Sequence, residues 1–217
     1  MLLIRPPGVY PAQADTFLLI SCLRREALTP GCRVLDVGTG SGAVAVAAAQ
    51  AGAQVTAVDV SRRAVAAAWA NGILHRRWIA VRRGDLLRPV GGEKFDLVVS
   101  NPPYVPAMRA FPPAHGIARA WDAGPGGRAL LDRICGESYG VLRPGGVLLL
   151  VHSAMCGVEA TCARLREAGF SCEVAARARQ PFGPVMRARA RWFEERGLIA
   201  RGQREEELVV IRGVRTA

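Results

Sequence analysis

The residues with the clearest chemical potential are Asn101-Pro102-Pro103-Tyr104, directly after the apolar run at residues 95–100. Two consecutive prolines fix two backbone φ angles and remove two N–H donors, so the carbonyls beside them stay available as acceptors. The side chain of Asn101 adds an amide oxygen, and Tyr104 adds an aromatic face. This NPPY motif suits a planar group that bears an NH2, although Asn before Pro also begins ordinary turns.

A glycine-rich turn and a set of carboxylates lie upstream of this motif. Asp36 opens the turn that contains Gly38 and Gly40, after a predicted strand and before a predicted helix, where a ligand can approach the backbone closely. Asp59 ends the next strand, where a carboxylate can hold both hydroxyls of a ribose. These positions indicate a cofactor that contains adenosine.

The third carboxylate, Asp85, follows the third predicted strand. It can accept the exocyclic amine of adenine while Leu86 packs on the ring, or it can be an ordinary turn residue. The spacing from Gly38 to Ala43 also fits a loose dinucleotide fingerprint, so NAD is an alternative. A carboxylate at position 36 would repel a pyrophosphate but receive an ammonium group, which favours S-adenosylmethionine and methyl transfer over hydride transfer.

Regular elements alternate along the chain and must position these residues. We expect strands at residues 33–37, 54–60, 79–82, 95–100, 147–152, 171–176 and 208–212, and helices at 16–27 (capped by Asp15), 41–50, 62–71, 128–141 and 157–168. This order predicts an α/β, doubly wound, seven-stranded and mostly parallel sheet with an antiparallel last strand. We expect a single domain over residues 1–217, with a helical lead-in at 1–30 and a basic insertion at 181–205 that shows no obvious crossover helix.

Charge and composition restrict the partners and the location. The net charge of +11 suits nucleic acid or the translation machinery, or it reflects a general bias toward Arg. The Arg-rich run at residues 187–193 could bind nucleic acid, but we favour an amphipathic helix that packs Trp192 and Phe193 on the core. The longest apolar runs fall far short of the ~20 residues that cross a membrane, and no secretory signal is visible, so we expect a cytoplasmic protein. Scattered cysteines predict no metal site, and His75, His115 and His152 form no motif.

Four segments together resemble the HemK family of methyltransferases, in the branch that methylates a release-factor glutamine. They are Val9-Tyr10-Pro11 with Asp15 to Leu19, the turn from Asp36 to Gly42, Asn101 to Tyr104, and Trp121 to Arg128. The chain departs from the family pattern at Ala14 and Ala123, and no segment resembles the helical N-terminal domain of many bacterial members.

The resemblance implies a class I, Rossmann-like methyltransferase with a release factor as its protein substrate. The cofactor would be lined by Thr16, Asp36, Gly38, Gly40, Asp59, Asp85 and Leu86, and Asn101 would lie between cofactor and substrate. Pro102, Pro103 and Tyr104 would complete the substrate site. Some members of the branch use a small activating partner, so such a subunit is possible here.

The chemistry of an amide acceptor depends on positioning, because its nitrogen lone pair is delocalised into the carbonyl. The oxygen of Asn101 and the carbonyl of Pro102 would each accept one N–H, and Tyr104 would stack on the planar group. No general base is needed before transfer. The same geometry suits N6 of adenine in RNA or DNA, which remains the alternative acceptor, and an inactive RNA-binding module is an alternative of another class.

Overall fold

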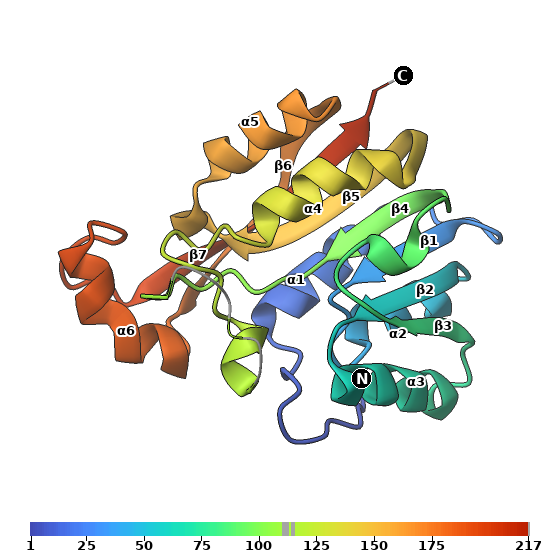
Figure 1. Cartoon of the computed structure of the whole chain (residues 1–217), viewed down its shortest axis with the longest axis horizontal. Helices are drawn as coiled ribbons and strands as arrows, with labels where there is room; N and C mark the ends of the chain where they lie inside the picture. Colours follow the sequence, from blue (N-terminus) through green and yellow to red (C-terminus); the bar gives the residue numbers. More distant parts are fainter. Residues whose placement is uncertain (110–112, 114–115, 217) are drawn as a thin grey trace.

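The computed structural model describes residues 1–109, 113 and 116–216, and its centre is one seven-stranded sheet in the order β3-β2-β1-β4-β5-β7-β6 (Figure 1). The strands are β1 Arg33–Val37, β2 Gln54–Asp59, β3 Ile79–Arg83, β4 Phe95–Ser100, β5 Leu142–Ser153, β6 Phe170–Pro181 and β7 Glu205–Arg215. Strands β1 to β5 pair in parallel, whereas β7 is antiparallel to both β5 and β6. The predicted doubly wound fold with an antiparallel last strand is confirmed.

Helices cover both faces of the sheet. They are α1 Ala14–Leu23, α2 Ala43–Gln50, α3 Arg62–Leu74, α4 Leu131–Glu137, α5 Val158–Glu167 and α6 Pro184–Glu195, with short 3-10 turns η1 Arg88–Val90, η2 Ile117–Ala120, η3 Ser138–Gly140 and η4 Ala154–Cys156. Helices α4 and α5 lie on one face, and α1, α2 and α3 lie on the other (Figure 1). Within the described residues, no helix combines the length and the apolar character needed to cross a bilayer.

Two apolar clusters form the core, one on each face. Along β4, Leu97 and Val99 belong to the cluster beneath α1 and α2, and Val98 belongs to the cluster beneath α4 and α5. A strand covered on both faces needs a continuous apolar run, because its side chains alternate between the two faces. This burial explains why strand β4 is apolar from Leu97 to Val99 and why the first polar side chains with access to a ligand come after it.

The Ala-rich sequence of α2 lets it approach α3 closely. Seven of its eight residues are buried. At its N-terminal end, a Cβ on Gly42 would lie only 2.9 Å from the Cα of Ala68 in α3, and the φ of Gly42 is 82°. Only glycine meets both conditions without strain. This contact fixes the turn between β1 and α2 against the neighbouring helix.

The predicted helices at 16–27 and 128–141 differ from the structure at both ends. Helix α1 begins at Ala14 after the N-cap residue Gln13, so Asp15 does not cap it. It ends at Leu23 rather than at residue 27, because the chain turns there and Glu26 forms an ion pair with Arg212 of β7 at 2.8 Å. Helix α4 is also shorter than predicted and passes into η3.

The segment between β6 and β7 contains a helix that the sequence analysis did not assign as a crossover element. Helix α6 begins at Pro184, a favourable first helical residue because proline lacks the N–H that would be unpaired there. It buries Met186, Ala190 and Phe193, and Trp192 packs on the same core from a half-buried position. The favoured interpretation of an amphipathic helix is therefore the one that the structure adopts.

The histidines in the described residues have structural surroundings. His152 is fully buried at the end of β5, and burial lowers its pKa to about 4. His75 lies at the C-terminal end of α3, with its Nε2 2.7 Å from the carbonyl of Leu2. His115 lies outside the described residues.

Candidate active site

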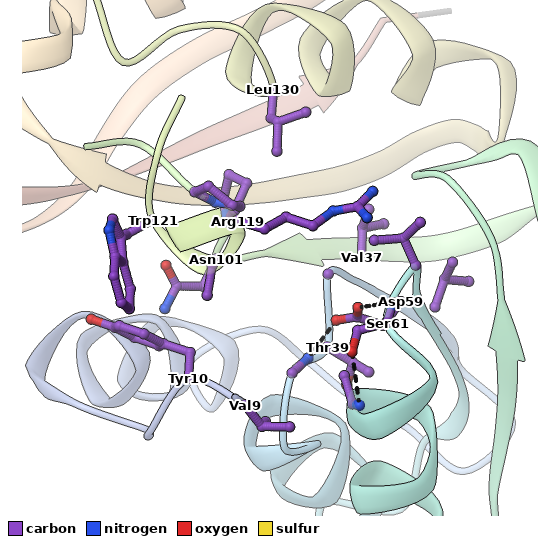
Figure 2. Close-up of a pocket in the computed structure, with 18 of the residues that line it drawn as sticks. Val9, Tyr10, Val37, Thr39, Asp59, Ser61, Asn101, Arg119, Trp121 and Leu130 are labelled. Atoms are coloured by element: carbon purple, nitrogen blue, oxygen red, sulfur yellow. Dashed lines mark hydrogen bonds between the residues drawn. The ribbon is translucent and has the colours of Figure 1, made fainter. Parts of the chain in front are cut away.

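A cavity of about 1070 Å³ lies at the carboxyl ends of β1, β2, β3 and β4. Ligands bind at this edge in open α/β sheets, because the connecting loops converge there. The structure brings every predicted site residue to this one cavity: Thr16, Asp36, Gly38, Gly40, Asp59, Asp85, Leu86, Asn101, Pro102, Pro103 and Tyr104 all line it. Figure 2 shows part of the lining of this cavity, with Asp59 and Asn101 labelled.

Asp36 is the most deeply buried of the carboxylates. Its Oδ2 accepts hydrogen bonds from the hydroxyl of Thr39 at 2.6 Å and from the backbone N–H of Ala45 at 3.1 Å. Burial nevertheless raises the pKa of Asp36 to about 7, because it outweighs these two bonds and because Asp59 is close by. A cationic group beside such a buried carboxylate would stabilise its charged form.

Asp59 is held by backbone donors on both of its oxygens. Oδ2 accepts from the N–H of Gly40 at 3.0 Å, and Oδ1 accepts from the N–H of Ser61 at 2.8 Å (Figure 2). Burial raises the pKa of Asp59 in spite of these bonds and of the positive charge of Arg119. Each carboxylate oxygen has a second lone pair, so the fixed side chain can still accept from two hydroxyls of a ligand.

Asp85 lies on the cavity wall with a partner of its own. Arg133 of α4 contacts both carboxylate oxygens, at 2.8 and 3.3 Å, and this hydrogen bonding lowers the pKa of Asp85. Leu86 beside it has a φ of 47°, a left-handed conformation that a leucine rarely adopts. Such strain is concentrated at functional sites. That Asp85 accepts the exocyclic amine of adenine stays a prediction. Arg133 would compete with adenine for the same carboxylate oxygens, and the sequence did not reveal this contact.

Asn101 is oriented by a chain of hydrogen bonds that begins at Asp15. The carboxylate of Asp15 can only accept, so the hydroxyl of Thr16 must donate to its Oδ1, at 3.2 Å. The oxygen of that hydroxyl then accepts from Nδ2 of Asn101 at 3.1 Å. Because the nitrogen of the amide is used in this contact, the amide oxygen of Asn101 is the atom left to accept from another group.

Asp15 also binds both tyrosines at this end of the cavity. Its Oδ2 accepts from the hydroxyl of Tyr104 at 3.1 Å and from that of Tyr10 at 3.4 Å. Burial and the charge of Asp15 raise the pKa of both phenols, so they remain neutral donors. Asp15 itself is only 2% exposed. Its role is to organise the residues around Asn101, which differs from the predicted role as a helix cap.

The loop after β4 is fixed at the backbone of Tyr104. The carbonyl of Tyr104 accepts from the thiol of Cys156 at 3.1 Å. A Cβ on Gly127 would lie 2.3 Å from the same carbonyl oxygen, so the residue at position 127 must be glycine for the two loops to pack. Tyr104 lines the cavity but is only 7% exposed. Its ring therefore offers little surface on which a ligand could stack.

Tyr10 and Trp121 were not among the predicted site residues, but their rings are better placed than that of Tyr104 to stack on a planar acceptor group. Both line the cavity, and the side-chain amide of Asn101 points toward the space between their rings (Figure 2). Arg119 and Arg133 are further cavity residues that the sequence analysis missed. The only sequence signal for the two aromatic residues was that each lies in a segment that resembles the HemK family.

The methyltransferase small domain matches residues 2–115 of this chain, a range that includes the glycine-rich turn, the three carboxylates and the NPPY motif. The chain belongs to the methyltransferase small domain family. The predicted resemblance to HemK-type enzymes is confirmed, because relatives of this chain are named as glutamine methyltransferases. A relative from Methanocaldococcus jannaschii, named "Putative protein N5-glutamine methyltransferase", is 34% identical over 83% of this chain and 90% of the relative.

Two further relatives extend the comparison to bacteria and to a solved structure. The release factor glutamine methyltransferase of Salmonella typhimurium is 34% identical, and the match covers 78% of this chain but only 63% of that protein. This methyltransferase therefore spans less than two thirds of that bacterial relative. The structure of the E. cuniculi Mtq2-Trm112 complex, described as responsible for methylation of the eRF1 termination factor, superposes with a TM-score of 0.66 at 25% identity. That match covers 96% of this chain and 99% of that one.

Proposed function

We propose that this methyltransferase transfers a methyl group from S-adenosylmethionine to the side-chain amide of a glutamine in a release factor. The observation that carries the proposal is the chain from Asp15 through Thr16 to Asn101, which leaves the amide oxygen of Asn101 as an acceptor for an NH2 group. The names of the archaeal and bacterial relatives support the choice of glutamine. A cytoplasmic location, where release factors act, follows from this proposal.

The residues of the cavity fit S-adenosylmethionine. When bound, S-adenosylmethionine supplies an electrophilic methyl carbon on a sulfonium that carries positive charge. Asp36 is buried and Asp59 is half-buried, and both have raised pKa values, so a cationic ligand would relieve the cost of their negative charge. Asp36 would receive the ammonium group, and Asp59 would accept from the ribose hydroxyls. A pyrophosphate would be repelled by the same pair of carboxylates.

The acceptor amide would be held rather than activated. The oxygen of Asn101 and the carbonyl of Pro102 each accept one N–H of the glutamine NH2, which directs the nitrogen lone pair into the cofactor side of the cavity. We assign the stacking role to Tyr10 and Trp121 in place of the buried ring of Tyr104, because the amide of Asn101 points between those two rings. The proton leaves to water after transfer.

A pH dependence of cofactor binding tests the role of Asp36. Its pKa of about 7 means that the side chain is neutral below that pH and must lose a proton before it can bind an ammonium group. We expect affinity for S-adenosylmethionine to rise about tenfold per pH unit from pH 5.5 toward 7 and then to level off. Calorimetry between pH 5.5 and 7.5 measures this, within the range where the ligand's own amine stays charged. A pH-independent affinity, or the same slope in Asp36→Asn, would contradict the assignment.

The acceptor is tested by methyl transfer from tritiated S-adenosylmethionine to purified release factor. We propose that the acceptor is the glutamine of a Gly-Gly-Gln loop in the release factor, so we expect label in the release factor and its loss when that glutamine is changed to Glu. Adenine N6 methylation is the alternative, and label in cell extract that is removed by nuclease but not by protease would favour it. RNA binding that weakens steeply with salt, with no transfer to any acceptor, would favour an inactive binding module.

A small activating subunit is also part of the proposal. Four large apolar side chains, Trp69, Ile73, Leu74 and Trp78, are exposed in α3 and just before the open edge strand β3. A cluster of this kind on a sheet edge is typical of a surface that binds another chain. The Mtq2 structure was solved as a complex with another protein, Trm112. The transfer assay is therefore run with and without a small Trm112-like protein, and activity that appears only with it supports a required partner.

A further inference from the structure

One side chain of helix α6, that of Arg189, contacts the two loop segments beside the cavity. Of the arginines in its basic run, Arg189 points into the protein, with a side chain 25% exposed. Its Nη1 donates to the carbonyl of Pro106 at 3.0 Å and forms an ion pair with Oδ1 of Asp122 at 2.6 Å. The side chain of Asp122 is only 8% exposed, and the positive charge of Arg189 compensates for the burial of its negative charge.

The two partners of Arg189 belong to two loop segments that pair with each other. The N–H of Val105 donates to the carbonyl of Trp121 at 2.7 Å, and the N–H of Ala123 donates to that of Val105 at 3.0 Å. A third bond runs from the N–H of Ala107 to the carbonyl of Gly124 at 2.9 Å. Arg189 therefore joins one group from each segment at the point where the two segments meet.

These segments carry side chains that face the acceptor. Tyr104 directly precedes Val105, and Trp121 directly precedes Asp122, and both line the cavity. Helix α6 is itself anchored, because Met186, Ala190 and Phe193 are buried on the core. A rigid support that grips both segments fixes the distance between their side chains, which is the requirement for a reaction that depends on positioning.

We propose that Arg189 is a positioning residue for methyl transfer, which holds the paired loops at Pro106 and Asp122 so that Trp121 and Tyr104 stay in place around the acceptor amide. This inference rests on the proposed function, since the acceptor site is the one assigned there. It gives the insertion between β6 and β7 a part in catalysis without any contact to substrate or cofactor.

The test compares Arg189→Met with Arg191→Met on the same helix. Arg191 has a side chain 92% exposed and pairs only with Glu195 among the ion pairs of the described residues, so it matches Arg189 in type and helix but not in contacts. We expect Arg189→Met to lower kcat on the release factor about tenfold to a hundredfold, with affinity for S-adenosylmethionine within about twofold of wild type. Arg191→Met should leave both quantities within about twofold. Arg189→Lys should retain most of the rate, because one ammonium can serve the two oxygens that share Nη1.

Hydrogen exchange supplies a readout that needs no acceptor. The amides of Val105, Ala107 and Ala123 should exchange about tenfold faster in Arg189→Met, while those of β1 and β2 keep their wild-type rates. Unchanged exchange at the three amides, or faster exchange throughout the protein, would overturn the proposal, as would local loosening with an unchanged kcat. If the wild type fails to methylate a release factor both with and without the small partner protein, the proposed acceptor is wrong, but the exchange comparison still decides whether Arg189 holds the loops.

Discussion

Replacing Asn101 with Ala is expected to reduce turnover about a hundredfold or more and to leave affinity for S-adenosylmethionine within a few-fold of wild type. The side chain of Asn101 takes part in the Asp15–Thr16 hydrogen-bond chain through its nitrogen and is proposed to hold the acceptor NH2 through its oxygen. Loss of a positioning hydrogen bond typically has an effect of this size. Single-turnover transfer to the release factor measures the rate, and calorimetry measures the affinity.

Met108→Ala is a suitable control for this variant, because Met108 lies in the same loop but is 75% exposed. It should behave as wild type in both measurements. Asn101→Asp gives a second, isosteric test: it keeps an oxygen acceptor but has no N–H to donate to Thr16, so its rate should also fall. Normal turnover in the Ala variant on the true acceptor would sink the role assigned to Asn101.

Replacing Asp59 with Ala is expected to weaken S-adenosylmethionine binding by about tenfold to a hundredfold, because charge-assisted hydrogen bonds to the ribose would be lost. The change also removes the acceptor of two backbone N–H groups, from Gly40 and Ser61. Asp59→Asn is an intermediate change, since it keeps one acceptor oxygen but loses the charge and the acceptor of one of the two backbone N–H groups. Calorimetry gives the affinities of all three proteins.

Turnover at saturating cofactor should change little in Asp59→Asn, because Asp59 is proposed to bind the ribose of the cofactor and not the acceptor amide. Glu195→Ala is the matched control: its carboxylate is on the surface and pairs with Arg191 alone among the ion pairs of the described residues. An affinity in Asp59→Ala equal to that of wild type would remove the ribose role from this side chain.

The positions of the main site residues were predictable because they depend on a single geometric rule. The carboxyl ends of parallel strands meet at one edge of a sheet, so Asp36, Asp59, Asp85 and Asn101 had to lie near one another once their strands were recognised. Strands β1, β2 and β4 were easy to recognise because most of their residues are buried and these buried residues are mostly apolar, whereas the edge strand β3 buries Ile79 alone. The cavity that these residues line confirms their proximity, and their individual roles stay predictions.

The contacts that orient these residues were not predictable in the same way. Asp15 binds Tyr104 across 89 positions of the sequence, and Arg133 binds Asp85 across 48. A local pattern contains no information about such pairs, so Asp15 looked like a helix cap and Asp85 like a free acceptor. For helix α6, the sequence favoured an amphipathic helix at the Arg-rich run, but it did not predict the start at Pro184 or the burial of Met186 and Ala190.

The place of β7 between β5 and β6 determines which parts of the sheet can fold while the chain is still being synthesised. Strands β1 to β4, which end at the cofactor side, leave the ribosome early and neighbour one another in the sheet. Strand β6 joins the sheet only through β7, so it has no partner in the sheet until the last strand is synthesised. Until then β5 and β6 expose open edges that invite pairing with other chains. The cofactor side can thus fold during translation, whereas the helix that carries Arg189 reaches its final position only when synthesis of β7 is finished.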